Sequence, residues 1–247
     1  MAGAAVLGRL NWVAAEVTAA VRETPRVRTL VLDTPDWPGH RAGQHLDVRL
    51  TAEDGYQAQR SYSVASAPGE PPAITVERLE DGEVSPYLVD ELEIGDRFEV
   101  RGPIGGYFVW EAAQSGPLLL VAGGSGIVPL MSMIRHRAAT GSDVPVRLLS
   151  SSRSLEDVIY RQELEELASR RDGLEVVHAL TRAQPPGWTG YARRVDGAML
   201  AEVAWPSEDG ALTYVCGPTS FVEAVAGGLV ELGHAPERIR TERFGGG

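Results

Sequence analysis

The sequence predicts two domains, an N-terminal antiparallel six-stranded β-barrel and a C-terminal doubly wound parallel sheet. Up to about Glu111, short stretches with partial apolar alternation are separated by Pro, Gly and Asp, which is typical of antiparallel strands. Beyond that residue, continuous apolar strands alternate with helical segments, which is typical of an α/β fold. We therefore expect one domain over residues 1–112 and another over residues 113–247.

Six segments of the N-terminal half have the composition of strands. Each contains β-branched residues and ends at turn residues; they are residues 12–21, 26–34, 43–51, 60–66, 72–80 and 96–103. Strands at this spacing favour a closed antiparallel barrel. One helix interrupts them over residues 85–95, because Ser85 can be its N-cap and Pro86 can take its first position.

The C-terminal half alternates strands with helices. The expected strands are residues 117–124, 144–152, 174–181 and 212–218, and the expected helices are residues 128–141, 154–173, 197–204 and 220–233. This alternation predicts a doubly wound parallel sheet, a fold that binds its ligands at the carboxyl ends of the strands.

Composition narrows the class of protein. The 247-residue chain has a net charge of −11, which argues against nonspecific binding to nucleic acid or anionic lipid. Its single cysteine, Cys216, excludes an intramolecular disulfide and a cysteine-held iron–sulfur cluster within this sequence. The histidines lack metal-ligand spacing, so we predict no metal site and expect most of them to be solvated. No apolar run has membrane length and no signal peptide is evident, which predicts a cytoplasmic protein.

A glycine-rich turn follows the first buried strand of the C-terminal half. Gly123, Gly124 and Gly126 stand between "LLLVA" and a helical segment that opens at Pro129. Glycine permits positive φ and close backbone approach, so amide groups at the helix N-terminus can face an anion such as a pyrophosphate. A plain tight turn is the alternative.

Two further turns have related features. Cys216, Gly217 and Pro218 end a strand at the edge where α/β folds place ligands, although a buried apolar cysteine before a helix start is the alternative. Gly82 and Ser85 precede the barrel's helix and form a second anion-ready terminus, for which simple N-capping is the alternative. Two such turns, one in each domain, suggest two nucleotide-like ligands that meet between the domains.

The stretch "RSYS", residues 60–63, places a cation, an aromatic ring and a hydroxyl within four residues, which strand pairing does not require. Followed by "GEVS", "GPIGGYF", "GGSGIVP", "CGP" and "ERF" in this order, it closely resembles the ferredoxin–NADP(H) reductase superfamily over nearly the whole chain. The chain is most similar to bacterial FAD and NAD(P)H reductase modules, here without an iron–sulfur domain.

The resemblance implies how the barrel binds FAD. Arg60 would pair with the flavin pyrophosphate, Tyr62 would lie on the isoalloxazine or ribityl side, and Ser63 would hydrogen-bond the flavin N5 edge. The "GEVS" turn would hold the second phosphate, which favours FAD over FMN. The implied FAD-binding residues are Arg60, Ser61, Tyr62, Ser63, Val76, Glu77, Arg78, Gly82, Glu83, Val84, Ser85 and Phe244. Phe244 would cover the flavin, with a mobile tail as the alternative.

The resemblance also implies a nicotinamide site. Ser63, Cys216 and Glu242 would be the catalytic residues, with Cys216 beside the nicotinamide and Glu242 as an acid near the flavin. The glycine turn would cradle the dinucleotide's pyrophosphate. The implied NADPH-binding residues are Gly123, Gly124, Ser125, Gly126, Ser152, Arg153, Tyr160, Arg161, Cys216, Gly217 and Pro218.

The loop after the second parallel strand predicts a preference for NADPH over NADH. The strand ends in serines, and Arg153 and Arg161 follow before and within the next helix. Arginine and serine can donate to a ribose 2′-phosphate, whereas an acid at this position would accept from a 2′-hydroxyl. Tyr160 could stack on the adenine. For Arg161 the alternative is an i,i+4 pair with Glu165 on a solvated helix face.

We therefore expect an FAD-containing oxidoreductase that takes a hydride from NADPH and passes electrons to a ferredoxin, an oxygenase component or another redox partner protein. The flavin would supply the redox chemistry, and the protein would supply orientation and electrostatics. A free-flavin reductase and a flavin-binding electron-transfer subunit without turnover of its own are the alternatives. The "GEVS" turn argues against the first, and Cys216 with Glu242 argues against the second.

Overall fold

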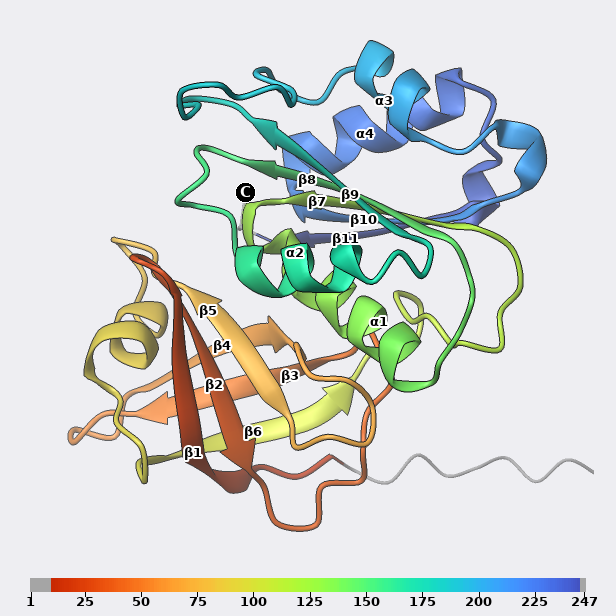
Figure 1. Cartoon of the computed structure of the whole chain (residues 1–247). Coiled ribbons are helices and arrows are strands. Elements are labelled where there is room, and N and C mark those ends of the chain that lie inside the picture. Colours follow the sequence, from red (N-terminus) through yellow and green to blue (C-terminus); the bar gives the residue numbers. More distant parts are fainter. Residues whose placement is uncertain (1–9, 245–247) are drawn as a thin grey trace, which may run out of the picture.

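The computed structural model describes residues 10–244. Figure 1 shows a β-barrel below an α/β unit whose helices lie on both faces of a sheet. Residues 1–9, on which the expectation of no signal peptide partly rests, lie outside the described residues, as do the last three. Between residues 10 and 244, no helix combines the length and hydrophobicity needed to traverse a bilayer.

The N-terminal half forms the expected antiparallel sheet of six strands, in the hydrogen-bonded order β4-β3-β6-β1-β2-β5. Alternate side chains point into the barrel and fill it with buried aliphatic groups, among them Leu30, Leu46 and Ile74. The strands are β1 (Val13–Thr24), β2 (Val27–Asp33), β3 (His45–Thr51), β4 (Gln57–Ser63), β5 (Ala73–Glu77) and β6 (Arg97–Ile104).

The barrel is open along the seam between β4 and β5, the two end strands of this order. The seam is bridged only at one end among the described residues, by an isolated bridge between Val64 and Ile74 and a 2.7 Å hydrogen bond from the Ala65 N–H to the Ala73 carbonyl. The facing edges of residues 57–63 and 75–77 therefore lack ladder pairing. We call this gap the β4–β5 seam.

The helical interruption of the barrel is shorter than expected. It is a π-helix, η1 (Tyr87–Glu91), and no side chain caps its N-terminus. The Ser85 hydroxyl instead accepts a hydrogen bond from the Leu79 N–H, at 3.0 Å, and so closes the preceding loop. The expected N-cap role of Ser85 is therefore wrong.

The C-terminal half is a five-stranded parallel sheet in the order β11-β10-β7-β8-β9. In Figure 1, α1 and α2 lie between this sheet and the barrel, and α3 and α4 cover the opposite face. The elements are β7 (Leu118–Gly123), η2 (Gly124–Gly126), α1 (Ile127–Ala139), β8 (Val146–Ser152), α2 (Arg161–Ser169), β9 (Leu174–Leu180), α3 (Gly197–Val203), η3 (Ser207–Asp209), β10 (Leu212–Pro218), α4 (Thr219–Glu231), η4 (Pro236–Arg238) and β11 (Ile239–Phe244).

Two elements differ from the sequence-based expectation. The helix expected over residues 154–173 begins only at Arg161, because Ser154 bonds Asp157 in a local turn and Tyr160 has a left-handed backbone, with φ 59°. The last strand, β11, was not expected. Its sequence alternates poorly, but it pairs in parallel with β10 at the edge of the sheet.

One hydrophobic cluster joins the two halves. It contains Ala42 and Ala65 from the barrel together with Met131 and Met133 from α1. A buried hydrogen bond of 2.7 Å, from the Ser132 hydroxyl to the Ser66 carbonyl, fastens the same helix to the barrel. The two halves are therefore packed against each other through α1.

The glycine turn after β7 lies against the end of β10. A Cβ atom at Gly126 would collide with the Cys216 carbonyl oxygen, and one at Gly123 would lie 2.8 Å from the Phe221 ring. Gly124 has a φ of +56°, which favours glycine. Close packing therefore explains why positions 123 and 126 are glycine, and the positive φ explains why position 124 is glycine.

This packing predicts opposite effects for two glycine-to-alanine substitutions. Gly126→Ala should lower the free energy of unfolding by about 1–3 kcal/mol, since the added methyl group must displace backbone atoms. Gly227→Ala should raise it by about 0.5–1 kcal/mol, because Gly227 lies inside α4 with open space at its Cβ position. Urea denaturation of both variants measures the difference, and equal effects would contradict the packing described.

Candidate functional site

A cavity of about 460 Å³ lies at the carboxyl ends of the parallel strands and is lined by both halves of the molecule. The barrel contributes Thr24, Arg26 and Val27 from the β1–β2 hairpin and Glu77 from β5. The α/β half contributes Gly123, Gly124, Ser125, Ser151, Ser152, Arg153, Asp157, Ile159, Thr181, Arg194, Val195, Pro218, Ser220, Phe221, Ala224, Val225 and Phe244. We call it the interdomain cavity.

Most of the expected dinucleotide-binding backbone borders this cavity. Gly123, Gly124 and Ser125 line it directly at the N-terminus of α1, whereas Gly126 is packed behind them. The backbone amides of the turn over residues 124–126, which leads directly into this 13-residue helix, form a site suited to an anion. Pro218, at the end of the neighbouring strand β10, also lines the cavity.

Two of the expected catalytic residues are neighbours at the edge of the sheet. Cys216 of β10 is paired in register with Glu242 of β11. Burial raises the pKa of Glu242 to about 7, and its Oε2 atom is buried without a hydrogen-bond partner among the described residues. Burial, reinforced by the Glu242 charge, also raises the pKa of the Cys216 thiol. The thiol is therefore neutral and unsuited to nucleophilic attack.

His45 connects these two residues to Ser63. It pairs with Ser63 in the β3–β4 ladder, and its Nδ1 atom lies 3.8 Å from Glu242 Oε1. Burial lowers the pKa of His45, so the ring is predominantly neutral near pH 7. The sequence did not single out His45. All five histidines are buried or half-buried, so the expectation that most are solvated is wrong.

The expected FAD residues of the barrel gather along the β4–β5 seam. Arg60 and Tyr62 lie on one face of β4, and burial strongly raises the pKa of the Tyr62 phenol. The 82–85 loop faces them, because the Glu83 carboxylate accepts hydrogen bonds from Arg60 at 3.1 Å and from Tyr56 at 2.9 Å. Val84 of this loop is buried in the barrel core.

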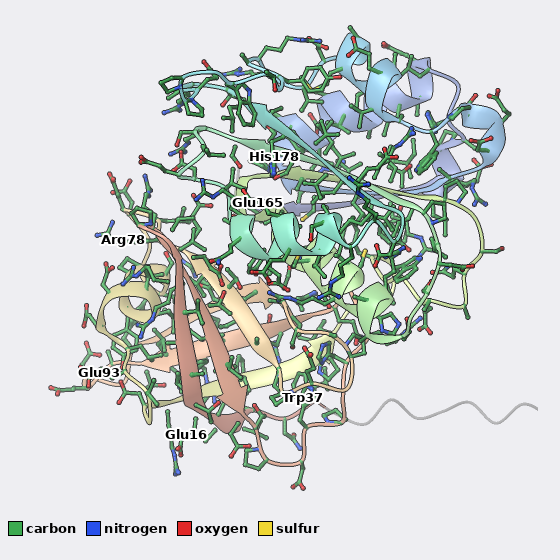
Figure 2. The ribbon with its side chains drawn as sticks, in the orientation of Figure 1. Glu16, Trp37, Arg78, Glu93, Glu165 and His178 are labelled. Atoms are coloured by element: carbon green, nitrogen blue, oxygen red, sulfur yellow. The ribbon has the colours of Figure 1, made fainter. Side chains whose placement is uncertain are left out.

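Three further expected FAD residues have different surroundings. Ser61 points to the outer face of the barrel, where its hydroxyl donates to Asp47 at 2.7 Å. Val76 is buried inside the barrel. Arg78 forms a 2.6 Å ion pair with Asp90 of η1, and Figure 2 shows it at the end of the barrel nearest the sheet's carboxyl edge.

Tyr160 and Arg161 lie outside the interdomain cavity. Tyr160 is 3% exposed and donates a hydrogen bond to Thr75, so it has no free face for an adenine. Arg161 Nε lies 4.0 Å from Glu165 Oε1, and Figure 2 shows Glu165 on α2 beside His178. The structure thus contradicts the adenine-stacking role expected for Tyr160 and matches the alternative given for Arg161.

Two arginines that were not expected from the sequence lie near Arg153, and one of them shares the cavity with it. Arg194 lines the cavity, and the Arg182 N–H donates to the Arg153 carbonyl at 2.8 Å. None of the three takes part in an ion pair within residues 10–244. The sequence-based expectation concerned only the loop after β8, whereas these two arginines follow β9 in the chain.

Phe244 is fixed by strand pairing. It lies opposite Pro218 in the β10–β11 ladder, packs against the cluster shared by both halves and lines the cavity. The alternative of a mobile tail is therefore wrong for Phe244, while the glycines that follow lie outside the described residues.

The buried carboxyl of Glu242 predicts a pH-dependent stability. Because the pKa is raised, the folded state binds a proton at Glu242 more tightly than the unfolded state does. The resulting gain in the free energy of unfolding is complete below about pH 4.5 and is lost as the pH rises to about 7. Relative to Glu242→Gln, the wild-type free energy of unfolding should fall over this range by at most about 3 kcal/mol. Urea denaturation at pH 5 and pH 8 measures it. Glu231→Gln, an exposed control on α4, should follow the wild type.

Comparisons with known proteins match both halves. The profile of the oxidoreductase FAD-binding domain matches residues 14–109, and that of the oxidoreductase NAD-binding domain matches residues 120–227. A flavohaemoglobin-like FAD/NAD-binding domain of a nitric oxide dioxygenase from Vibrio cholerae superposes with a TM-score of 0.84 at 26% identity, covering 95% of this chain and 99% of that one. A cytochrome P450 reductase from Amycolatopsis gives 0.82 at 27% identity, covering 98% and 73%.

Curated relatives give the same result. The glycine betaine monooxygenase reductase subunit of Chromohalobacter salexigens is 33% identical over 91% of this chain, which spans only 62% of that relative's length. Ferredoxin–NADP reductase B of Sorangium cellulosum is 34% identical over 90% of this chain and 93% of its own length. With an FAD-binding half, an NAD-binding half and this extent of similarity, the chain belongs to the ferredoxin–NADP(H) reductase superfamily.

Proposed function

We propose that the protein is an FAD-dependent reductase that takes a hydride from NADPH and passes electrons to a redox partner protein. The observation that carries this proposal is the interdomain cavity, which is lined by the barrel strand β5, the glycine turn before α1 and the end of β11. In this proposal residues 1–112 form the FAD-binding domain and residues 113–247 the NADPH-binding domain.

The β4–β5 seam fits FAD. The two strand edges are unpaired, and Arg60 lies opposite the 82–85 loop, so a pyrophosphate between them would meet a guanidinium and the loop backbone. The Glu83 carboxylate now accepts from the Arg60 guanidinium and would have to yield that position to the phosphate. Tyr62 supplies an aromatic face further along the same strand.

The interdomain cavity fits NADPH. The N-terminus of α1 offers backbone amides to the dinucleotide's pyrophosphate. Arg153 and Arg194, which line the cavity, would offer guanidinium groups to the 2′-phosphate, and the backbone of Arg182 lies beside that of Arg153. Asp157 also lines the cavity, but its carboxylate already accepts a 2.7 Å hydrogen bond from Ser154.

Bound FAD supplies the hydride acceptor, and the chain supplies position and proton control around it. Ser63 would offer a hydroxyl to the flavin edge, and Phe244 would cover the ring at the end of β11. Cys216 would contact the nicotinamide as a neutral thiol. Glu242 and His45, 3.8 Å apart, would hold and exchange a proton beside the hydride path.

A partner protein is the proposed electron acceptor. Relatives of this chain include the reductase subunit of a glycine betaine monooxygenase and the ferredoxin reductase component of a 3-ketosteroid-9-alpha-monooxygenase. These are components that work with a second protein, which supports a ferredoxin or an oxygenase component as the acceptor here.

The seam predicts that the purified protein releases FAD, not FMN, on denaturation, as chromatography of the released flavin would establish. Arg60→Ala should weaken FAD retention by roughly ten- to a hundred-fold, because one charge-assisted hydrogen bond contributes about 1.5–3 kcal/mol. Gln59→Ala, at an exposed neighbouring position on the same strand, is the matched control and should retain FAD. Recovery of FMN, or of free flavin that exchanges rapidly, would favour a free-flavin reductase instead.

Arg153 and Arg194 in the cavity predict that NADPH is preferred over NADH. Arg153→Ala and Arg194→Ala should each lower kcat/KM for NADPH by roughly ten- to a hundred-fold and leave kcat/KM for NADH nearly unchanged, since only NADPH carries the 2′-phosphate. Arg161→Ala, outside the cavity, should not alter the preference. Steady-state kinetics with both nucleotides measures this, and equal losses with the two nucleotides would contradict the assignment.

A further inference from the structure

Tyr160 begins a line of hydroxyl groups that crosses from the α/β half into the barrel. Its phenol donates to the Thr75 hydroxyl on β5, which lies 2.8 Å from the Thr29 hydroxyl on β2. Thr29 in turn donates to Glu23 Oε1 on β1, at 2.7 Å. Each hydroxyl can therefore donate in the same direction, and the line ends on a carboxylate, an arrangement in which neighbouring hydrogen bonds strengthen one another.

Arg135 of α1 holds the Tyr160 ring from a second side. Its guanidinium carbon lies 4.8 Å from the ring centroid, within the range of a cation–π contact. The same guanidinium donates to both oxygens of Glu163, at 2.9 and 2.6 Å, and to the Ala65 carbonyl of the barrel, at 2.7 Å. Tyr160 thus contacts α1 through its ring and the barrel through its hydroxyl, and its carbonyl accepts a 2.9 Å hydrogen bond from the Leu164 N–H of α2.

The backbone of Tyr160 is left-handed, with φ 59° and ψ 24°. This conformation is rare for an aromatic residue and costs on the order of 1 kcal/mol or more, so the contacts of the side chain must maintain it. It makes the chain turn sharply between residues 152–159 and α2. Ser152, Arg153 and Ile159 of this segment line the interdomain cavity.

The other end of the Tyr160 hydrogen bond lies on the strand assigned to the flavin. Thr75 is followed on β5 by Val76 and by Glu77, which lines the same cavity. The bond between Tyr160 and Thr75 therefore joins the loop that carries Arg153 to the strand that borders the β4–β5 seam. Neither Tyr160 nor Thr75 lines the interdomain cavity, but the bond between them couples the positions of the two segments that do.

We propose that Tyr160 is a positioning residue, whose hydroxyl bond to Thr75 fixes the 152–160 loop against β5 and so sets the distance between nicotinamide and flavin. The inference rests on the proposed function, because it concerns the hydride transfer between these two ligands. Such transfer needs reacting atoms within about 3–3.5 Å, and an error of about 1 Å can lower the rate by about a hundred-fold.

Tyr160→Phe is the sharpest test, since it removes the hydroxyl and keeps the ring against Arg135. FAD content and the Kd for NADP⁺ should not change, whereas the rate of flavin reduction at saturating NADPH should fall by about ten-fold or more. In steady state, kcat should fall with little change in KM. Thr75→Val removes the same bond from the barrel side, and the double variant should be no slower than the slower single variant.

Ser132→Ala is the matched control. It also removes a buried hydrogen bond between the halves, from α1 to the Ser66 carbonyl. This bond involves neither the 152–160 loop nor Thr75, and the Ser66 hydroxyl keeps its 3.1 Å bond from the Ala73 N–H. It should lower the melting temperature without slowing flavin reduction. An unchanged reduction rate in Tyr160→Phe with full FAD, additive losses with Thr75→Val, or equal slowing in Ser132→Ala would each overturn the positioning role.

A second measurement separates this inference from the proposed function. Hydrogen exchange on the purified protein, without NADPH, should show the amides of residues 152–160 and 73–77 exchanging several-fold faster in Tyr160→Phe than in the wild type. If NADPH could not reduce the wild-type protein but exchange were still faster in Tyr160→Phe, the proposed reaction would be refuted and the link between loop and strand would stand. Unchanged exchange at both segments would refute the link itself.

Discussion

The docking of helix α1 on the barrel is the contact on which the rest of the molecule depends. Gly43 makes it possible, because a Cβ there would collide with the Phe108 carbonyl and lie 2.8 Å from the end of Met133. Since α1 begins at the glycine turn, its packing also fixes where that turn points. The helix N-terminus therefore faces the barrel strand β5 across the cavity.

The interdomain cavity changes character along its length. Its outer end holds Arg153 and Arg194 in a chain whose net charge is −11, so the local charge is opposite to that of the whole molecule. Its inner end is bordered by the rings of Phe221 and Phe244, and the nearby Glu242 is buried with a raised pKa. A ligand with charged phosphates at one end and a flat, weakly polar ring at the other matches this gradient.

Much of the fold was predictable from the sequence, because each half has its own hydrophobic period. The six barrel strands and the alternation of buried strands with helices are local patterns. Among the expected site residues, Gly123, Gly124 and Ser125 border the interdomain cavity and Arg60 lies opposite the 82–85 loop. Their contacts and positions follow from turns and strand ends, which neighbouring residues determine.

What the sequence did not reveal depends on residues brought together from distant segments. His45 reaches Glu242 only because β3 and β11 meet at the domain junction, and Arg182 lies beside Arg153 only because β8 and β9 are adjacent. Tyr160 was misplaced for a local reason. Its segment has the apolar spacing of a helix, and a left-handed backbone at an aromatic residue leaves no sequence signal.

The β4–β5 seam has a consequence for the protein before it receives its cofactor. Two unpaired strand edges are templates for other strands, and proteins normally cover such edges to avoid aggregation. A flavin seated in the seam would act as the missing strand. The folded protein without its cofactor would then expose more hydrogen-bonding backbone than the loaded form, and would be the form more prone to pair with other strands.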